Sequence, residues 1–184
     1  MNKEMKIVCL GDSITWGFPL GPRYSWVHML AETLQVQILN KGVNGDTTSG
    51  MYHRFDRDVL AHNPSHVIIM GGANDVVFED PLESICWNYR EMANKAQKAG
   101  ITVIIGLPTP IDDDYYEKPL SQLRNWLKEF VKENQYKFID FPAAFYDDQG
   151  SLKTELLIAN SGHPAITGYQ EMFKQIDISI FSQE

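Results

Sequence analysis

Short runs of consecutive apolar residues alternate along this chain with longer stretches in which apolar residues recur every three or four positions. The runs are typical of strands buried on both faces of a parallel sheet, and the longer stretches of amphipathic helices. Apolar runs occupy residues 7–10, 36–39, 67–70, 102–107 and 137–140, and helical spacing is found at residues 24–34, 51–61, 82–99 and 120–134. This alternation predicts an α/β fold with helices on both faces of one parallel sheet.

A last helix is expected to begin beside residue 163, with Pro164 in its first turn, because proline suits that position. Its core-facing residues are predicted to be Ile166, Tyr169, Phe173, Ile176 and Ile180. The chain has no internal repeat, low-complexity segment or linker. At this length we expect residues 1–184 to form a single domain.

The charge balance is acidic, with sixteen Lys and Arg against twenty-four Asp and Glu and a formal net charge of −8. Such a chain would repel phosphate backbones and anionic membrane surfaces, so nucleic acid is not an expected partner. No apolar run approaches membrane-spanning length, and the first six residues lack the apolar region of a secretory signal. Cys9 and Cys86 are predicted to be buried free thiols, which fits a cytoplasmic location. Composition does not indicate an oligomeric state.

The tripeptide Gly11-Asp12-Ser13 directly follows the first apolar run. It places a serine hydroxyl at the carboxyl end of a buried strand, where open α/β sheets bind ligands. Taken alone, the tripeptide is more typical of a strand-to-helix turn with Ser13 as the helix N-cap.

Three further polar segments follow apolar runs or precede the last helix. Gly45 lies in residues 40–47, Asn74 in residues 71–75, and His163 in residues 160–164. Each has an ordinary structural interpretation, as a turn glycine, an Asx turn and a helix-capping histidine respectively. Their conjunction with Ser13, in this order along the chain, favours a catalytic interpretation.

The four segments together resemble those of the SGNH (GDSL) hydrolases, a family named for the Ser, Gly, Asn and His that match Ser13, Gly45, Asn74 and His163 here. The resemblance covers nearly the whole chain. It implies a three-layer α/β/α sandwich with a flavodoxin-like five-stranded parallel sheet in the order 2-1-3-4-5. It also implies that Ser13 is the nucleophile, that His163 is its general base, and that the oxyanion hole is formed by the N–H groups of Ser13 and Gly45 and the amide of Asn74.

Position 160 departs from the family pattern, because members usually carry Asp three residues before the His and this chain has Asn160. Asn160 could orient the imidazole as a weaker third catalytic residue. Another acceptor could replace it, such as Asp148, Glu155 or a backbone carbonyl. Alternatively, activity could be reduced or lost, leaving a binding protein with an SGNH fold. If a missing carboxylate limits catalysis, Asn160→Asp should raise ester turnover.

The expected substrate is a small-molecule ester with a short acyl or acetyl group, since the segments leave only modest loops and no long hydrophobic lid. Thioesters and lysophospholipids remain alternatives. The candidate substrate-binding residues are Asp12, Phe18 and Tyr24, whereas Trp26 is expected to pack the first helix. No metal-ligand spacing is present, and the proposed chemistry needs no metal or cofactor. A phosphate or nucleotide binder is disfavoured, because Asp12 would oppose a phosphate and no glycine-rich fingerprint is present.

Overall fold

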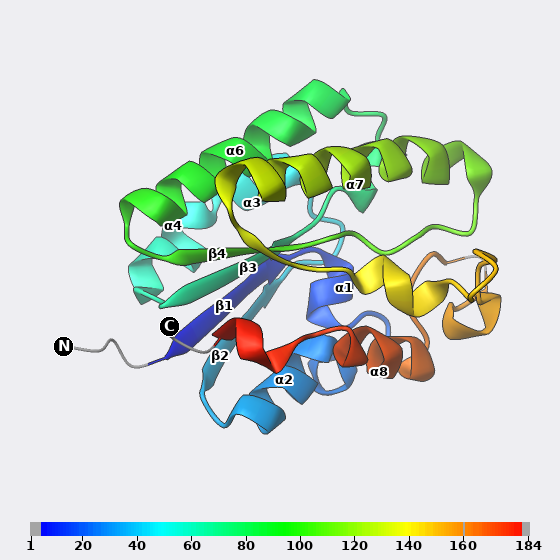
Figure 1. Cartoon of the computed structure of the whole chain (residues 1–184), viewed down its shortest axis with the longest axis horizontal. Helices are drawn as coiled ribbons and strands as arrows, with labels where there is room; N and C mark the ends of the chain where they lie inside the picture. Colours follow the sequence, from blue (N-terminus) through cyan, green and yellow to red (C-terminus); the bar gives the residue numbers. More distant parts are fainter. Residues whose placement is uncertain (1–4, 160, 182–184) are drawn as a thin grey trace.

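Five parallel strands form one sheet in the order β2-β1-β3-β4-β5, as predicted (Figure 1). This computed structural model describes residues 5–159 and 161–181. Gly11, at the end of β1, pairs with Gly42 of β2 on one side and with Met70 of β3 on the other. The strands are β1 (Lys6–Gly11), β2 (Gln37–Gly42), β3 (His66–Met70), β4 (Thr102–Gly106) and β5 (Lys137–Ile139). The carboxyl ends of the three strands β2, β1 and β3 therefore meet at one edge of the sheet.

Helices cover both faces of this sheet (Figure 1). Along β1, Ile7 and Cys9 face the layer of α2 (Trp26–Leu34) and α8 (Ile166–Lys174), and Val8 and Leu10 face the layer of α3 (Thr48–His53), α6 (Leu82–Lys98) and α7 (Asp114–Asn134). All four strand residues are fully buried. Each layer therefore has its own apolar core, as continuous apolar strand sequences require.

Shorter elements connect these layers. They are the α-helices α1 (Ser13–Trp16), α4 (Phe55–Asp58) and α5 (Ala73–Val77), and the 3₁₀ helices Pro22–Tyr24, Leu60–His62, Phe141–Phe145, Thr154–Leu156 and Ile178–Phe181. Cys9 and Cys86 are buried free thiols, as expected. Within the described part of the chain, no helix combines the length and apolar character needed to cross a bilayer.

Three helix predictions need correction. The helix expected over residues 51–61 is divided into α3, α4 and a 3₁₀ turn, with Arg54 between the first two in a non-helical conformation (φ −96°, ψ 3°). Helix α7 begins at Asp114, earlier than predicted, and contains Pro119; the side chain of Asp113 caps it by accepting from the N–H of Tyr115. An N-cap that satisfies the first free N–H groups helps the helix to start upstream of the proline.

The last helix also differs from the prediction. Helix α8 begins at Ile166, and Pro164 precedes it in a bridge to Leu157. Ile166 is 45% exposed, so it does not belong to the core stripe, and Ile176 and Ile180 lie beyond the end of the helix at Lys174. Pro164 lies in a bridge and Ala165 is extended, so His163 precedes the helix in a loop.

Candidate active site

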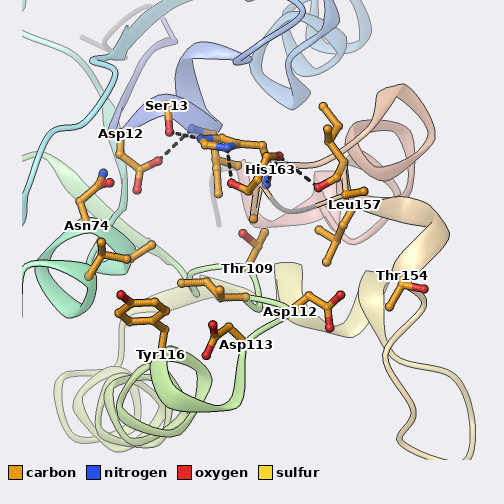
Figure 2. A pocket seen from close by; sticks show the side chains of 18 of the residues that line it. Asp12, Ser13, Asn74, Thr109, Asp112, Asp113, Tyr116, Thr154, Leu157 and His163 are labelled. Atoms are coloured by element: carbon orange, nitrogen blue, oxygen red, sulfur yellow. Dashed lines mark hydrogen bonds between the residues drawn. The ribbon is translucent and has the colours of Figure 1, made fainter.

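Ser13 and His163 form a hydrogen-bonded pair at the carboxyl edge of the sheet (Figure 2). Ser13 is the first residue of α1, directly after Asp12, whose side chain caps that helix by accepting from the N–H of Ile14 at 2.9 Å. The Oγ of Ser13 lies 2.9 Å from Nε2 of His163. These residues are 150 positions apart in sequence, so only the tertiary fold brings them within hydrogen-bond reach.

Two strand-end glycines let α1 pack closely against the sheet. A Cβ on Gly11 would lie 2.1 Å from Thr15 Oγ1 and 2.6 Å from the carbonyl oxygen of Met70. A Cβ on Gly42 would lie 2.2 Å from the backbone nitrogen of Trp16. Because these separations are far inside van der Waals contact, side chains at either position would displace the helix that carries Ser13.

The backbone around His163 determines which ring nitrogen carries the proton. Nδ1 lies 2.7 Å from the carbonyl oxygen of Ser161. A carbonyl can only accept a hydrogen bond, so Nδ1 must donate, and Nε2 of the neutral ring is left to accept from the Ser13 hydroxyl. Burial lowers the pKa of His163 below its ordinary value, and the Ser161 carbonyl partly offsets that effect. The imidazole is therefore neutral, and in the tautomer that a general base requires, at neutral pH.

Asn74 lies at the start of α5 and lines the same cleft (Figure 2). The turn after β2 holds its side chain. Its Nδ2 donates to the carbonyl oxygen of Asp46 at 2.8 Å. An amide nitrogen has two hydrogens, so one remains for a ligand after this bond is made. Gly45 directly precedes Asp46, with φ +76°, in a turn closed by a bond from Asp46 N–H to the Val43 carbonyl. This conformation accounts for a glycine at position 45.

Asp12 is buried beside the nucleophile and is only 2% exposed. Desolvation raises the pKa of its carboxyl to about 7, and the nearby carboxylates of Asp75 and Asp46 add to the rise, against the hydrogen bond from the Ile14 N–H. The side chain lines the cleft next to Ser13 (Figure 2). Asp12 is therefore a cleft residue whose charge changes near neutral pH.

The other candidate residues lie at different distances from this centre. The Phe18 ring packs on the His163 imidazole, with centroids 4.8 Å apart, and the carbonyl of Phe18 accepts a hydrogen bond from the Tyr169 hydroxyl. Tyr24 is 48% exposed, and neither it nor Phe18 is among the described residues that line the cleft. Trp26 is buried against Phe141, as expected of a packing residue. Position 160 lies outside the described residues.

The cleft has a volume of about 740 Å³ and includes residues that sequence reasoning missed (Figure 2). Thr109 follows β4 and is buried, and Tyr116 comes from the early part of α7. Thr109 follows the fourth apolar run, so its place after a strand end was the signal that could have found it. The lining side chains with carboxylates are Asp12, Asp112, Asp113 and Glu155, and no Lys or Arg is among the described lining residues. Across residues 5–159 and 161–181, no group of three His, Cys, Asp or Glu side chains is placed to hold a metal ion.

Residues 9–171 match the family model of the GDSL-like Lipase/Acylhydrolase family. This match covers most of the chain and agrees with the sheet order and with the Ser13–His163 pair. The chain belongs to this family and is an esterase by class.

Similar proteins of known sequence or structure support this assignment. A G-D-S-L family protein from Desulfitobacterium hafniense DCB-2 superimposes with a TM-score of 0.86 at 33% identity, covering 93% of this chain and 97% of that one. An acetylxylan esterase from Geobacillus stearothermophilus is 26% identical over 152 residues, which is 74% of this chain and 68% of the esterase. An arylesterase from Vibrio mimicus is 30% identical over 105 residues, 54% of this chain and 52% of that enzyme.

Proposed function

We propose that this protein hydrolyses short-chain acyl or acetyl esters through an acyl-enzyme on Ser13, with His163 as the general base. The observation that carries the proposal is the 2.9 Å contact between Ser13 Oγ and the unprotonated Nε2 of His163. A hydroxyl next to a base of this kind is the arrangement that activates a serine for attack on a carbonyl.

The reaction follows from the positions of these atoms. Nε2 of His163 takes the Ser13 proton as Oγ attacks the ester carbonyl, and a tetrahedral oxyanion forms. The proposed donors to that oxyanion are the N–H of Ser13, the N–H of Gly45 and the free amide hydrogen of Asn74. Collapse of the tetrahedral species breaks the ester C–O bond, and Nε2–H gives its proton to the departing alcohol. His163 then takes a proton from water as the water attacks the acyl carbonyl. The bond from that carbonyl to Ser13 Oγ breaks, Nε2–H returns its proton to Oγ, and the acid leaves.

The proposed orienting group for His163 is the carbonyl of Ser161, rather than a carboxylate. Its 2.7 Å contact with Nδ1 supports the backbone-carbonyl alternative considered for this chain. A carbonyl holds the tautomer, but it stabilises the imidazolium less than a carboxylate does, because it carries only a partial charge. We therefore still expect Asn160→Asp to raise turnover.

The character of the cleft supports an uncharged substrate. Its carboxylates at positions 112, 113 and 155, with no described lining Lys or Arg, would repel the phosphate groups of lysophospholipids and of coenzyme A thioesters. The relatives named as acetylxylan esterase and arylesterase act, by their names, on esters without such groups. A neutral acetyl or short acyl ester is the proposed substrate class.

The direct test is hydrolysis of p-nitrophenyl acetate, butyrate and octanoate by wild type, Ser13→Ala and Asn160→Asp, with Ser179→Ala as an exposed serine control. We expect turnover that decreases with chain length, a loss of at least about 10³-fold in Ser13→Ala, and no loss in the control. Mass spectrometry of quenched wild type should show one added acyl group on the peptide containing Ser13.

Persistence of turnover in Ser13→Ala would refute the mechanism. Absence of turnover in wild type would instead favour a binding protein, the alternative that Asn160 motivates. Acetyl-coenzyme A tests the substrate class: we expect a high KM that falls as salt is added, because ions screen the repulsion between the cleft and the phosphates. A KM below that of p-nitrophenyl acetate at low salt would argue against a neutral substrate.

A further inference from the structure

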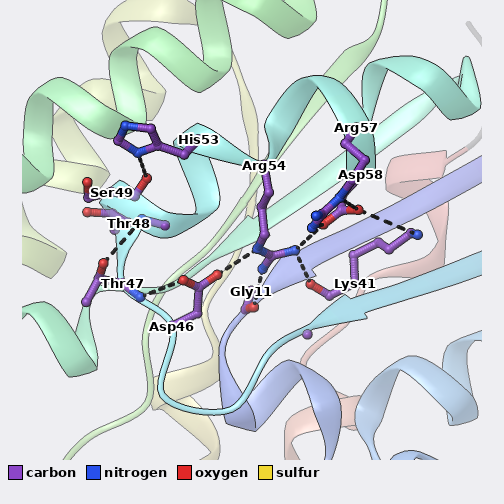
Figure 3. A network of polar contacts seen from close by, with 12 residues as sticks. Gly11, Lys41, Asp46, Thr47, Thr48, Ser49, His53, Arg54, Arg57 and Asp58 are labelled. Atoms are coloured by element: carbon purple, nitrogen blue, oxygen red, sulfur yellow. Dashed lines mark hydrogen bonds and ion pairs between the residues drawn. The ribbon is translucent and has the colours of Figure 1, made fainter.

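Arg54 lies between α3 and α4, and its guanidinium joins several backbone segments at the carboxyl ends of β1 and β2 (Figure 3). Its side chain is 10% exposed. Nη2 donates to the carbonyl of Gly11 at 2.9 Å, and Nη1 donates to the carbonyl of Lys41 at 2.9 Å and to Asp58 Oδ2 at 3.0 Å. Nε donates to Asp46 Oδ2 at 2.7 Å. One side chain thus contacts the end of β1, the end of β2 and the turn that follows β2.

These contacts reach the proposed oxyanion donors through a single residue, Asp46. The backbone carbonyl of Asp46 accepts a hydrogen bond from the Asn74 amide, and its carboxylate accepts one from Arg54. Asp46 is also the residue that directly follows Gly45 in the chain. The other carboxylate oxygen accepts from the N–H of Thr47. The turn that carries Gly45 and holds the Asn74 amide is therefore fixed by the guanidinium to the strand that leads to Ser13.

The glycine at position 50 leaves room for the Asp46 carboxylate beside Arg54. A Cβ on Gly50 would lie 1.9 Å from Asp46 Oδ1, so any other residue at position 50 would displace the carboxylate that Arg54 holds. Arginine also suits its own place, because its rigid planar fork can donate in several directions at once, whereas a lysine ammonium acts as a single flexible point charge.

We infer that Arg54 is a positioning residue for ester hydrolysis, which sets the oxyanion donors of Asn74 and Gly45 relative to Ser13 by holding Asp46. The inference rests on the proposed function. Arg54 is not among the described residues lining the cleft, so it acts through Asp46 and does not contact substrate. Its loss should therefore affect the transition state more than ground-state binding, and kcat more than KM.

The expected size follows from what the donors contribute. Removing one oxyanion donor outright lowers kcat by about 10²–10³-fold in a well-studied serine protease, and a misplacement of about 1 Å can cost about 10²-fold. We expect Arg54→Met and Arg54→Lys to lower kcat by about 10- to 100-fold and to change KM by less than about threefold. Lysine should not restore kcat, because it retains the positive charge but lacks the planar set of N–H donors of the guanidinium.

Arg57 offers a matched control on the next turn of the chain. It pairs with the same Asp58 carboxylate, through Nη2 to Oδ2 at 2.9 Å and Nε to Oδ1 at 2.9 Å, but its side chain is 73% exposed. In the described structure it has no bond to Asp46 or to the Gly11 carbonyl. Arg57→Met removes an arginine from the same carboxylate, and we expect kcat within about twofold of wild type.

The experiment measures kcat and KM for p-nitrophenyl acetate in wild type, Arg54→Met, Arg54→Lys, Arg54→Ala and Arg57→Met, together with the inhibition constant of a boronic acid that forms a tetrahedral adduct on serine. Boronate affinity should fall with kcat in the Arg54 variants, because the adduct needs the oxyanion donors. Added guanidinium ion at low millimolar concentration should restore part of the kcat of Arg54→Ala, whereas ammonium should not. The rescue and the Lys variant keep the test decisive if Arg54→Met fails to fold.

The inference is overturned if folded Arg54 variants keep wild-type kcat, or if boronate affinity is unchanged while kcat falls. It is also overturned if Arg57→Met loses as much kcat as Arg54→Met. A wild type without turnover would be a failure of the proposed function, whereas an active wild type with active Arg54 variants would be a failure of this inference alone.

Discussion

Replacing Asp12 with Asn should make the stability of this protein respond differently to pH. Asp12 is 2% exposed, and burial raises the pKa of its carboxyl from 3.8 to about 7. The folded state therefore holds the Asp12 proton more tightly than the unfolded state. Asn is isosteric and uncharged, and its amide oxygen can still accept from the N–H of Ile14, so Asp12→Asn removes the ionisation with little change of shape.

The magnitude follows from the difference in pKa. Below pH 3.8 the carboxyl is protonated in both states and contributes no difference, whereas above about pH 7 both states are ionised and the folded state bears the full cost of a buried charge. A difference of about three pKa units corresponds to about 4 kcal/mol. The free energy of unfolding of the variant, relative to that of wild type, should therefore increase by about 3 kcal/mol between pH 4.5 and pH 8.

Urea unfolding of both proteins across this range, followed by circular dichroism, measures the difference directly. Asp58→Asn is the control of opposite sign: hydrogen bonding to Arg57 is the largest cause that lowers the pKa of Asp58 to about 2. The stabilisation that the ionised Asp58 carboxylate provides is complete above pH 3.8 and is lost only as pH falls through about 2. The effect of Asp58→Asn on the free energy of unfolding should therefore be constant from pH 4.5 to pH 8. A gain for Asp12→Asn that is equally independent of pH would refute the inference that a buried charge at position 12 limits stability.

Two further predictions concern the catalytic pair and its support. In Asp12→Asn, which lacks the cleft carboxyl that ionises near neutral pH, kcat/KM should rise with pH, reach half its maximum below pH 6.5 and then remain level, because burial lowers the pKa of His163 and the neutral ring is the base. A midpoint above pH 6.5 would mean that a negative charge acts on the imidazole. Gly42→Ala places a Cβ 2.2 Å from the backbone nitrogen of Trp16, so we expect a loss of about 1–3 kcal/mol in urea unfolding and a lower ester turnover. Unchanged stability and turnover would show that α1 can move away at no cost.

The strands were the most predictable part of the fold, because a strand buried on both faces is a short uninterrupted apolar run. The five runs correspond to β1–β5. Helix ends were less predictable, since they depend on local capping and on contacts from elsewhere. Asp113 starts α7 upstream of Pro119, and the bridge between Leu157 and Pro164 keeps the segment before α8 extended. Neither effect is visible in apolar spacing.

The candidate site divides in the same way. Ser13 and Asn74 follow strand ends, and the resemblance of their segments to one family identified them together with Gly45 and His163. The bond from Nδ1 of His163 to the Ser161 carbonyl could not be predicted, because the conformation of the loop decides which backbone atom faces the ring. The contacts of Arg54 were likewise hidden, since its partners come from three separate segments of the chain.

By itself, the sequence determined the α/β class, the buried strands, the family and the four residues that name it, because these depend on local residue type and order. The strand order was implied only through the family resemblance. Tertiary structure alone decided the 2.9 Å contact between Ser13 and His163, the tautomer of the imidazole, the raised pKa of Asp12 and the bond from Arg54 to Asp46. Hydrogen bonds and desolvation depend on which distant atoms meet and which exclude water, and that is settled only when the chain has folded.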